Sequence, residues 1–482
     1  MLDLQQLIGG NFVPAVSGRT YERLDPLTGE VASRAPASNI DDVEAAVSAA
    51  ATAFKSWSKT GPTHRRTILL KAADVLEGKA DEFARLIVTE TGGTAAWAGF
   101  NTVLAAGILR ETASMITHIQ GEVIPSDKQG TLSFAVRRPA GVCVGIAPWN
   151  APVILATRAI AMALACGNTV VLKASEACPA VHLLIGRSLQ EAGLPDGVVN
   201  VITNAPEDAA KVVEALVAAS AVRRVNFTGS TKVGRIIAEL CGKHLKPALL
   251  ELGGKAPMVI LEDADIDAAV NGAIFGAFAN SGQICMSTER IIVSEKIADE
   301  FVHKLSVRAR DLPVGDPRSH VVLGSLVATE AADRMERFIA DALGKGAKLV
   351  AGGTRDRSII DATLLDHVQP GMLTYDEESF GPVKPIIRFK DDAEAVRIAN
   401  DTQYGLSASV YSRNVSRAFA VAEQIESGIC HINGPTVHDE PQMPFGGVKN
   451  SGYGRFGGKT AIDQFTDIRW ITVEDPQQRY PF

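Results

Sequence analysis

One stretch decides the fold: Asn226-Phe227-Thr228-Gly229-Ser230-Thr231-Lys232-Val233-Gly234, which passes from a strand-like run through a Gly-Ser-Thr turn into a helical run. Glycine at the turn permits close approach of a ligand to the backbone, and the start of the helix supplies free N–H groups and a positive dipole end. We therefore expect an anion site at Gly229 and Ser230. An ordinary capped turn has the same pattern, because the stretch lacks the glycine spacing of the common dinucleotide fingerprint.

The same alternation of short strand-like runs with longer helical runs begins near residue 140 and continues beyond residue 290. It is typical of a parallel sheet with crossover helices, so the sequence predicts an α/β fold. The expected strands are Val142–Ala147, Thr169–Leu172, Val198–Ile202, Val225–Phe227, Met258–Leu261 and Arg290–Val293. The expected helices are Val181–Ala192, Asp208–Ala219, Lys232–Cys241 and Ala264–Ala279.

The first 120 residues have a different pattern, which predicts a helical layer after a short extended segment. The expected elements are an extended segment at Gln6–Val13 and Ala-rich helices at Asp42–Ser58, His64–Thr91 and Ala95–Gln120. Two further strand-like stretches, Thr131–Pro139 and Asp467–Glu474, stand apart from the alternating region.

Length and composition exclude several classes of partner. The 482 residues are 46% hydrophobic and 21% charged, which predicts two or three globular domains. A net charge of −7 argues against binding to nucleic acid or to an anionic membrane, since both favour clustered Lys and Arg. No apolar run is long enough for a spanning helix, and the N-terminus lacks the basic start of a signal peptide, so we expect a cytoplasmic protein.

Six cysteines are spread along the chain without a CxxC pair, so neither a metal site nor a disulfide framework is expected. Cys285 differs from the others because it follows the turn-like segment Ser281-Gly282-Gln283-Ile284 instead of lying inside an apolar run. A catalytic cysteine needs partial exposure and a means of becoming a thiolate, and the end of an element can provide both. The alternative is a buried cysteine without a chemical role.

Glu251 stands alone in an apolar, strand-like segment, Leu249–Leu252, which is followed by Gly253 and Gly254. Burial raises the pKa of a carboxyl group toward the range of a general base. A structural glutamate that accepts hydrogen bonds from backbone N–H groups is the alternative.

Polar side chains also follow two of the expected strands, at the sheet edge where open α/β folds bind ligands. Pro148-Trp149-Asn150 follows the first strand, and the Asn150 amide can stabilise an oxyanion or cap a helix. Lys173 and Glu176 follow the next strand, where both could equally be solvated surface charges.

Together these motifs resemble the aldehyde dehydrogenase superfamily over essentially the whole chain. The resemblance is carried by Pro148-Trp149-Asn150, Lys173-Ala174-Ser175-Glu176, Phe227-Thr228-Gly229-Ser230-Thr231, Glu251-Leu252-Gly253-Gly254-Lys255, Gly282-Gln283-Ile284-Cys285, Glu378-Ser379-Phe380-Gly381-Pro382 and Pro444-Phe445-Gly446-Gly447. It implies that Cys285 is the nucleophile, Glu251 the base that activates the hydrolytic water, and Asn150 an oxyanion donor beside the Cys285 N–H.

The resemblance also implies NAD as cofactor, with NADP as the weaker alternative. Lys173 and Glu176 would hold the adenosine ribose, Ser230 the pyrophosphate, and Glu378 with Phe380 the nicotinamide ribose. The full set expected at the cofactor is Trp149, Lys173, Glu176, Gly229, Ser230, Glu378 and Phe380.

The family's architecture implies three parts and a homodimer or homotetramer. A Rossmann-type cofactor domain would span 1–120 and 140–252, and an α/β catalytic domain 253–450. A β oligomerisation arm with a C-terminal tail would span 121–139 and 451–482.

Within the superfamily the chain is most similar to bacterial salicylaldehyde, vanillin and benzaldehyde dehydrogenases. This similarity lies in Trp97-Ala98-Gly99-Phe100-Asn101, Gln283-Ile284-Cys285-Met286-Ser287-Thr288-Glu289-Arg290, Cys430-His431-Ile432-Asn433-Gly434 and Tyr480-Pro481-Phe482. It implies oxidation of an aromatic aldehyde to the carboxylic acid through a thioester. The expected substrate pocket consists of Trp97, Arg158, Ile284, Met286 and Phe445, although Trp97 and Phe445 could instead be core packing.

Several alternatives stay open at this point. The same thiol could hydrolyse esters without a redox step, or act on aliphatic aldehydes with broad specificity. The fold could also serve a binding protein that has lost catalysis, or a coenzyme A-acylating enzyme, although such enzymes usually lack the glutamate that Glu251 supplies.

Overall fold

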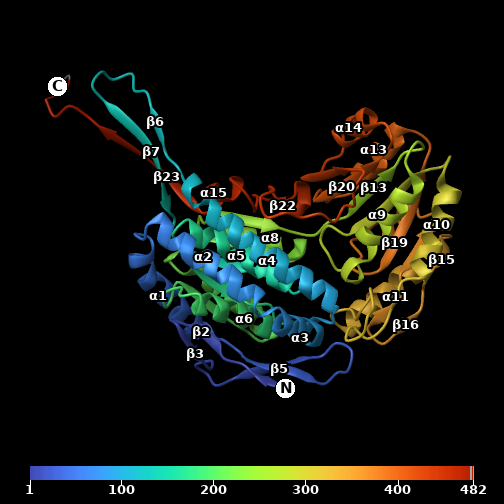
Figure 1. The fold of residues 1–482 in the computed structure, drawn as a ribbon, viewed down its shortest axis with the longest axis horizontal. Coiled ribbons are helices and arrows are strands. Elements are labelled where there is room, and N and C mark those ends of the chain that lie inside the picture. The colour runs from blue at the N-terminus through green and yellow to red at the C-terminus, as the bar shows by residue number, and fades with distance from the viewer. Residues whose placement is uncertain (478–479, 481) are drawn as a thin grey trace.

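The structure is a computed structural model that describes residues 1–477, 480 and 482. Its ribbon forms two α/β lobes and a narrow arm that projects from the first lobe (Figure 1). Both main sheets are largely parallel and covered by helices, so the predicted α/β class is confirmed. Within the described ranges, no helix is both long and apolar enough to span a membrane. Pro481, part of one motif quoted above, lies outside the described residues.

The first lobe contains an eight-stranded sheet. Its strands, in spatial order, are β22 (Gly452–Tyr453), β12 (Ala248–Glu251), β11 (Val222–Thr228), β8 (Val142–Ile146), β9 (Thr169–Lys173), β10 (Val199–Ile202), β2 (Gln6–Ile8) and β3 (Asn11–Val13). From β8 the chain builds outward through β9 and β10, then returns to the other side of β8 to form β11 and β12. The direction of winding therefore changes between β8 and β11, which is where open α/β sheets bind ligands.

Helices cover both faces of this sheet, which explains why its strands are apolar at successive positions. Val142, Val144 and Ile146 of β8 pack against α1 (Ile40–Trp57), α7 (Ala209–Ala218) and α8 (Thr231–Lys243). Cys143 points to the opposite layer. That layer consists of α2 (Pro62–Glu77), α3 (Ala80–Thr91), α4 (Ala95–Met115), α5 (Pro152–Ala165) and α6 (Pro179–Glu191).

The second lobe contains a seven-stranded sheet, which the chain enters directly after β12 through residues 252–255. Its strands, in spatial order, are β15 (Lys348–Ala351), β18 (Thr363–Asp366), β19 (Val383–Phe389), β14 (Thr288–Ser294), β13 (Ala256–Ile260), β20 (Ser407–Tyr411) and β21 (Ile429–Ile432). The helices on one face are α9 (Ile266–Phe278) and α10 (Ala298–Arg310). Those on the other face are α11 (Thr329–Gly344), α12 (Leu373–Asp376), α13 (Asp392–Asn400) and α14 (Val415–Ala422).

The arm is a three-stranded antiparallel sheet of β6 (Glu122–Ile124), β7 (Leu132–Pro139) and β23 (Thr466–Val473). The two isolated strands expected from the sequence pair with each other along their full length, from Leu132 opposite Val473 to Pro139 opposite Thr466. Other residues of the 451–482 segment lie against the first lobe, because β22 pairs with β12.

Two expectations for the N-terminal region were wrong. The single helix expected at His64–Thr91 is two helices, α2 and α3, because Gly78 ends the first and Lys79 precedes the second. The extended segment at Gln6–Val13 is a hairpin of β2 and β3, because Gly9 and Gly10 adopt φ of 61° and 86° and reverse the chain.

The helix expected at Ala95–Gln120 ends at Met115 and continues as the 3-10 turn Ile116–His118. The sequence also failed to predict a small sheet of β1 (Leu2–Asp3), β5 (Val31–Pro36) and β4 (Thr20–Leu24). The remaining elements are β16 (Arg355–Asp356), β17 (Ile359–Ile360) and α15 (Thr460–Gln464), with 3-10 turns at Pro206–Asp208, Ala279–Gly282 and Lys449–Ser451.

Candidate active site

A strained turn between α9 and β14 positions Cys285. Asn280, Ser281 and Gly282 all have positive φ, at 47°, 55° and 73°, which is uncommon for residues with a side chain. Both side chains are anchored: the Asn280 amide donates to the Asn150 carbonyl oxygen at 3.0 Å, and the Ser281 hydroxyl donates to the Gly324 carbonyl oxygen at 3.3 Å. These bonds hold a backbone conformation that would otherwise be costly.

Cys285 differs from the other cysteines in its surroundings. Four cysteines are buried, Cys430 is exposed on β21, and Cys285 is half-buried. Cys285 contributes to the walls of two cavities, one on each side of it. The second glycine after Glu251 is explained here, because a Cβ on Gly254 would lie 2.3 Å from the Cys285 carbonyl oxygen.

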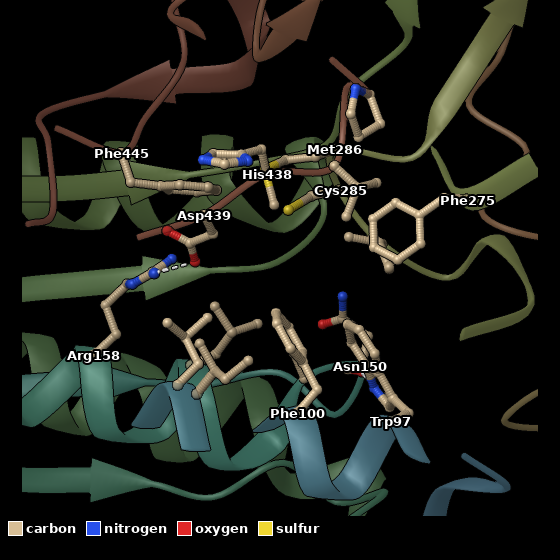
Figure 2. Close-up of a pocket in the computed structure, with 17 residues that line it drawn as sticks. Trp97, Phe100, Asn150, Arg158, Phe275, Cys285, Met286, His438, Asp439 and Phe445 are labelled. Carbon is tan, nitrogen blue, oxygen red and sulfur yellow. Dashed lines mark hydrogen bonds and ion pairs between the residues drawn. The ribbon is translucent and has the colours of Figure 1, made fainter. Parts of the chain in front are cut away.

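The first cavity, which we call the aromatic cavity, has a volume of about 320 Å³. All five residues predicted for the substrate pocket line it, and Figure 2 shows the side chains of Trp97, Arg158, Met286 and Phe445 around a common space. Asn150 and Cys285, which were expected as catalytic residues, also line it. The other lining residues were not expected there; they are Phe100, Leu104, Ala151, Ile154, Leu155, Phe275, Pro435, Val437, His438 and Asp439.

Trp97 forms one wall of the aromatic cavity and is held by its helix terminus. Thr94 caps α4 by accepting a hydrogen bond from the Trp97 N–H at 3.3 Å. The Trp97 indole N–H donates to the Asn150 carbonyl oxygen at 2.9 Å, and its ring stacks on Phe100 with centroids 5.4 Å apart. Trp97 is therefore part of the cavity wall and not a purely core side chain.

An ion pair interrupts the apolar wall. Arg158 of α5 pairs with Asp439, both side chains are more than nine-tenths buried, and the guanidinium lies 4.5 Å from the centre of the Phe445 ring. No local signal marked Asp439, because the pairing joins segments 281 residues apart.

The second cavity, which we call the switch-point cavity, has a volume of about 250 Å³ and lies at the ends of β8, β11 and β12. Five of the seven residues expected at the cofactor line it, together with Glu251. Its walls are Pro148, Trp149, Asn150, Thr228, Gly229, Ser230, Glu251, Leu252, Gly253, Cys285, Arg334, Glu378 and Phe380. Arg334 was not expected there.

Glu251 is the last residue of β12 and is 1% exposed. Neither carboxyl oxygen has a hydrogen-bond partner among the residues that the structure describes. Burial raises the pKa of Glu251 to about 7, against a smaller opposing influence of the Cys285 thiol. Burial and the Glu251 carboxylate in turn raise the pKa of the Cys285 thiol. The structural alternative, a glutamate bonded to backbone N–H groups, is therefore not what the structure shows.

Asn150 does not act as a helix cap, since Ala151 takes the N-cap position of α5. The Asn150 side-chain amide instead donates to the Gln283 carbonyl oxygen at 3.0 Å. An amide nitrogen carries two hydrogens, so one donor is available to a ligand beside Cys285.

Glu378 is held at the far wall of the switch-point cavity. Its carboxylate accepts from the Gly254 N–H at 2.8 Å, its carbonyl oxygen accepts from Arg334 at 2.6 Å, and burial raises its pKa to about 7. Nearby, Phe380 meets Trp149 edge to face with ring centroids 5.7 Å apart.

Ser379, between Glu378 and Phe380, is fixed from the interior of the second lobe. Its N–H and hydroxyl both donate to Glu289, at 2.7 and 2.6 Å. Lys255 and Lys384 neutralise this buried carboxylate and lower its pKa to about 2 against the effect of burial.

The remaining cofactor residues are arranged less clearly. Ser230 caps α8 by accepting from the Val233 N–H at 3.3 Å, as in the alternative of an ordinary capped turn, while it also lines the switch-point cavity. Lys173 and Glu176 form an ion pair at the end of β9, and Asn204 donates to Glu176 at 2.8 Å. Neither charged residue is among the described residues that line the two cavities.

The arrangement combines a thiol, an amide donor and a buried carboxylate that has no hydrogen-bond partner among the described residues, all in the walls of the two cavities. These are the components of covalent catalysis with a general base and an oxyanion donor.

Comparison with known proteins agrees with this chemistry. The family model described as "Aldehyde dehydrogenase family" matches residues 12–471. A vanillin dehydrogenase from Pseudomonas fluorescens is 59% identical over 482 residues, covering all of both chains. The crystal structure of a salicylaldehyde dehydrogenase from Pseudomonas putida G7 complexed with salicylaldehyde is 48% identical, with a TM-score of 0.98 and full coverage of both chains.

A second similar structure, PnpE in complex with nicotinamide adenine dinucleotide, is 37% identical, with a TM-score of 0.95 and 99% coverage of each chain. The match extends over nearly the full length, and the resemblance inferred from the sequence motifs is confirmed. The chain belongs to the aldehyde dehydrogenase family.

Proposed function

We propose that this protein oxidises an aromatic aldehyde to the carboxylic acid, with NAD as the oxidant and Cys285 as the nucleophile. The observation that carries the proposal is that Cys285 and Asn150 line both cavities. An aldehyde that enters through the aromatic cavity and bonds to the Cys285 sulfur would therefore have its carbonyl carbon next to the switch-point cavity. Water completes the balance: aldehyde, NAD and water give the acid, NADH and a proton.

Residues of the switch-point cavity fit a nicotinamide dinucleotide. Gly229 and Ser230 precede α8, whose first N–H groups suit a pyrophosphate, while Trp149, Glu378 and Phe380 line the part of the cavity that also contains Cys285. When bound there, the dinucleotide supplies the acceptor for the hydride that leaves the aldehyde carbon.

The chain's own groups account for the remaining steps. Glu251 takes the thiol proton, because its raised pKa makes it a base near neutral pH. The thiolate attacks the aldehyde carbon, and the alkoxide that forms accepts hydrogen bonds from the Asn150 amide and the Cys285 N–H. After oxidation the acyl group is a thioester on Cys285. Glu251 releases the thiol proton to solvent and then takes a proton from water, whose oxygen attacks the thioester carbon. The C–S bond breaks to release the acid, and the Cys285 sulfur regains a proton from Glu251.

The walls of the aromatic cavity support a planar substrate. Trp97, Phe100, Phe275 and Phe445 line this cavity, and aromatic pairs add roughly 0.5–1.5 kcal/mol beyond burial. The relatives named vanillin and salicylaldehyde dehydrogenase support the same substrate class.

We further propose NAD in preference to NADP, since Glu176 would repel a 2′-phosphate while accepting hydrogen bonds from a ribose. The first lobe would bind the cofactor and the second supply the nucleophile. The arm would join subunits of a homodimer or homotetramer, because exposed Trp470 and Ile468 on β23 offer an apolar surface.

The experiment is a comparison of NADH formation with benzaldehyde, vanillin, salicylaldehyde, acetaldehyde and hexanal, using purified protein and Cys285→Ala as the control. We expect higher kcat/KM for the aromatic aldehydes and no turnover by Cys285→Ala, although that variant should still bind NAD. Higher kcat/KM for both aliphatic aldehydes would overturn the substrate class. If the protein hydrolysed esters but formed no NADH from any aldehyde, the proposed redox reaction would be wrong and the protein would be an esterase.

A further inference from the structure

The Arg158–Asp439 ion pair is unusual because it lies in the wall of a cavity that is otherwise mainly apolar. The two side chains are 6% and 7% exposed, and Figure 2 shows Arg158 extending from α5 to meet the Asp439 carboxylate beside the cavity. A buried ion pair gains little net stability, because both charges lose their hydration. Stabilisation of the fold therefore does not account for an ion pair at this position.

Asp439 has acceptor capacity that the protein does not use. Its Oδ2 accepts from Arg158, whereas its Oδ1 is buried and has no partner among the described residues. A buried acceptor without a donor is costly, so an occupant of the cavity that brings a hydroxyl would relieve that cost. Arg158 can only donate, so the two members of the pair recognise different groups.

The segment that carries Asp439 is tied to the residues that directly follow the nucleophile. The Thr436 hydroxyl donates to the Met286 carbonyl oxygen at 2.7 Å and lies 2.8 Å from the Thr288 hydroxyl. Two ends of the aromatic cavity are thus held relative to each other: Cys285 with Asn150 at one, and Asp439 with Arg158 at the other. A ring that offers its aldehyde to the sulfur would turn a ring substituent toward the ion pair.

We infer that Asp439 accepts a hydrogen bond from a hydroxyl group on the substrate ring, so that the preferred substrates are hydroxybenzaldehydes. This inference rests on the proposed function and narrows its substrate class. It assigns the hydroxyl to Asp439 and not to Arg158, which the sequence placed in the substrate pocket.

His438 is the other titratable group of this wall and the main competitor for the role. Its Nε2 lies 2.8 Å from a carboxyl oxygen of Glu440 outside the cavity, and its ring is 5.0 Å from that of His431. Nε2 is therefore engaged by Glu440, whereas Nδ1 keeps a lone pair, so His438 is a second acceptor that the test must separate from Asp439.

The test compares matched aldehydes that differ only in a donor: the 2-, 3- and 4-hydroxybenzaldehydes, each against its methyl and its methoxy analogue. The methyl group is close in size to the hydroxyl, whereas the methoxy group keeps an acceptor oxygen without a donor. We expect wild-type kcat/KM for at least one hydroxy isomer to exceed that of both analogues by about tenfold or more, as for a hydrogen bond to a charged group.

Asp439→Ala should lower this hydroxy-to-methyl ratio at least about tenfold, mainly by reducing kcat/KM for the hydroxy compound. Because Asp439→Ala leaves a buried guanidinium unpaired and can impair folding, the double variant Arg158→Met/Asp439→Leu provides the same test without either charge. Asp366→Ala is the matched control, since Asp366 is a buried carboxylate paired with Arg388 at 2.8 Å outside the cavity, and the ratio should not change.

The outcomes separate the two proposals. If no aldehyde yields NADH, the proposed function itself fails. If aromatic aldehydes are oxidised but the ratio is the same in wild type and both Asp439 variants, the inference fails and the proposed function stands. A ratio that His438→Ala abolishes and Asp439→Ala preserves would assign the hydroxyl to His438 and overturn the inference.

Discussion

The Asn150 side-chain amide donates to the carbonyl oxygen of Gln283 at 3.0 Å, two residues before the nucleophile. The group proposed to stabilise the oxyanion thus also fixes the turn that positions the thiol. Asn280 joins the same turn to the Asn150 backbone at 3.0 Å. Two asparagines therefore connect the end of β8 with the nucleophile, but only Asn150 lines the cavities among the residues described.

Substitution of the two asparagines separates catalysis from positioning. Asn150→Ala should lower kcat roughly 100- to 1000-fold, the effect of losing one oxyanion donor. Asn280→Ala should lower the melting temperature, because it removes an anchor of a strained turn, and affect kcat less. Steady-state kinetics and thermal unfolding of both variants check this; a larger loss of kcat in Asn280→Ala would reassign the main role to the turn.

Glu251→Gln should accumulate the acyl-enzyme, since an amide cannot take a proton from water. The expected trace is a stoichiometric burst of NADH followed by slow turnover. If Glu251 is also the sole base for the thiol, the burst itself will be slow. Stopped-flow absorbance and intact-protein mass after quenching distinguish these outcomes, and fast turnover without an adduct would exclude Glu251 as the base.

The pH dependence of wild-type turnover should reflect the raised pKa of Glu251. The base acts when it is deprotonated, so the rate of thioester hydrolysis should rise as pH increases through about 7. Single-turnover hydrolysis of a preformed acyl-enzyme measures this step without the binding steps. A rate that is flat across this range would show that another group limits hydrolysis.

Glu176→Gln should shift cofactor preference toward NADP. The neutral amide no longer repels a 2′-phosphate, and Lys173 is released from its ion pair with Glu176. We expect kcat/KM for NADP relative to NAD to rise about tenfold, and Lys173→Met to change the ratio in the opposite direction. Equal use of both cofactors by the wild type would show that Lys173 already outweighs Glu176.

Glu90 provides a test of stability away from the active site. It is 1% exposed, accepts from Ser33 at 2.5 Å and from the first N–H groups of α6, and burial raises its pKa to about 7. The folded state therefore prefers the protonated form, and stability should fall as pH rises from the unfolded pKa through about 7.

Glu90→Gln removes this titration. Its melting temperature relative to wild type should be higher at about pH 8 than at about pH 5, with a difference in unfolding free energy of up to roughly 3 kcal/mol. Buried Glu251 and Glu378 titrate in both proteins, so their effects cancel in the comparison. A difference that does not depend on pH would contradict the prediction.

Local sequence patterns predicted the parallel strands and the strand ends at which the candidate catalytic residues lie. The period of the apolar residues placed β8, β9, β10 and β11 nearly correctly, and Glu251 was identified because a charge at a buried strand end is costly. What local patterns could not supply is long-range pairing. Asp439 became visible only through Arg158, 281 residues away.

The two cavities have Asn150 and Cys285 in common, and their other described lining residues differ. Substitutions that spare Trp97, which bonds to the Asn150 carbonyl oxygen, can therefore change one wall while the lining residues of the other stay the same. During evolution, substitutions in α4, α5 and the segment around Asp439 could change which aldehyde binds. The residues of the switch-point cavity, where the hydride acceptor would bind, could meanwhile stay the same. The same separation can be used in protein engineering, by substituting residues of the aromatic cavity so that the enzyme accepts new aldehydes.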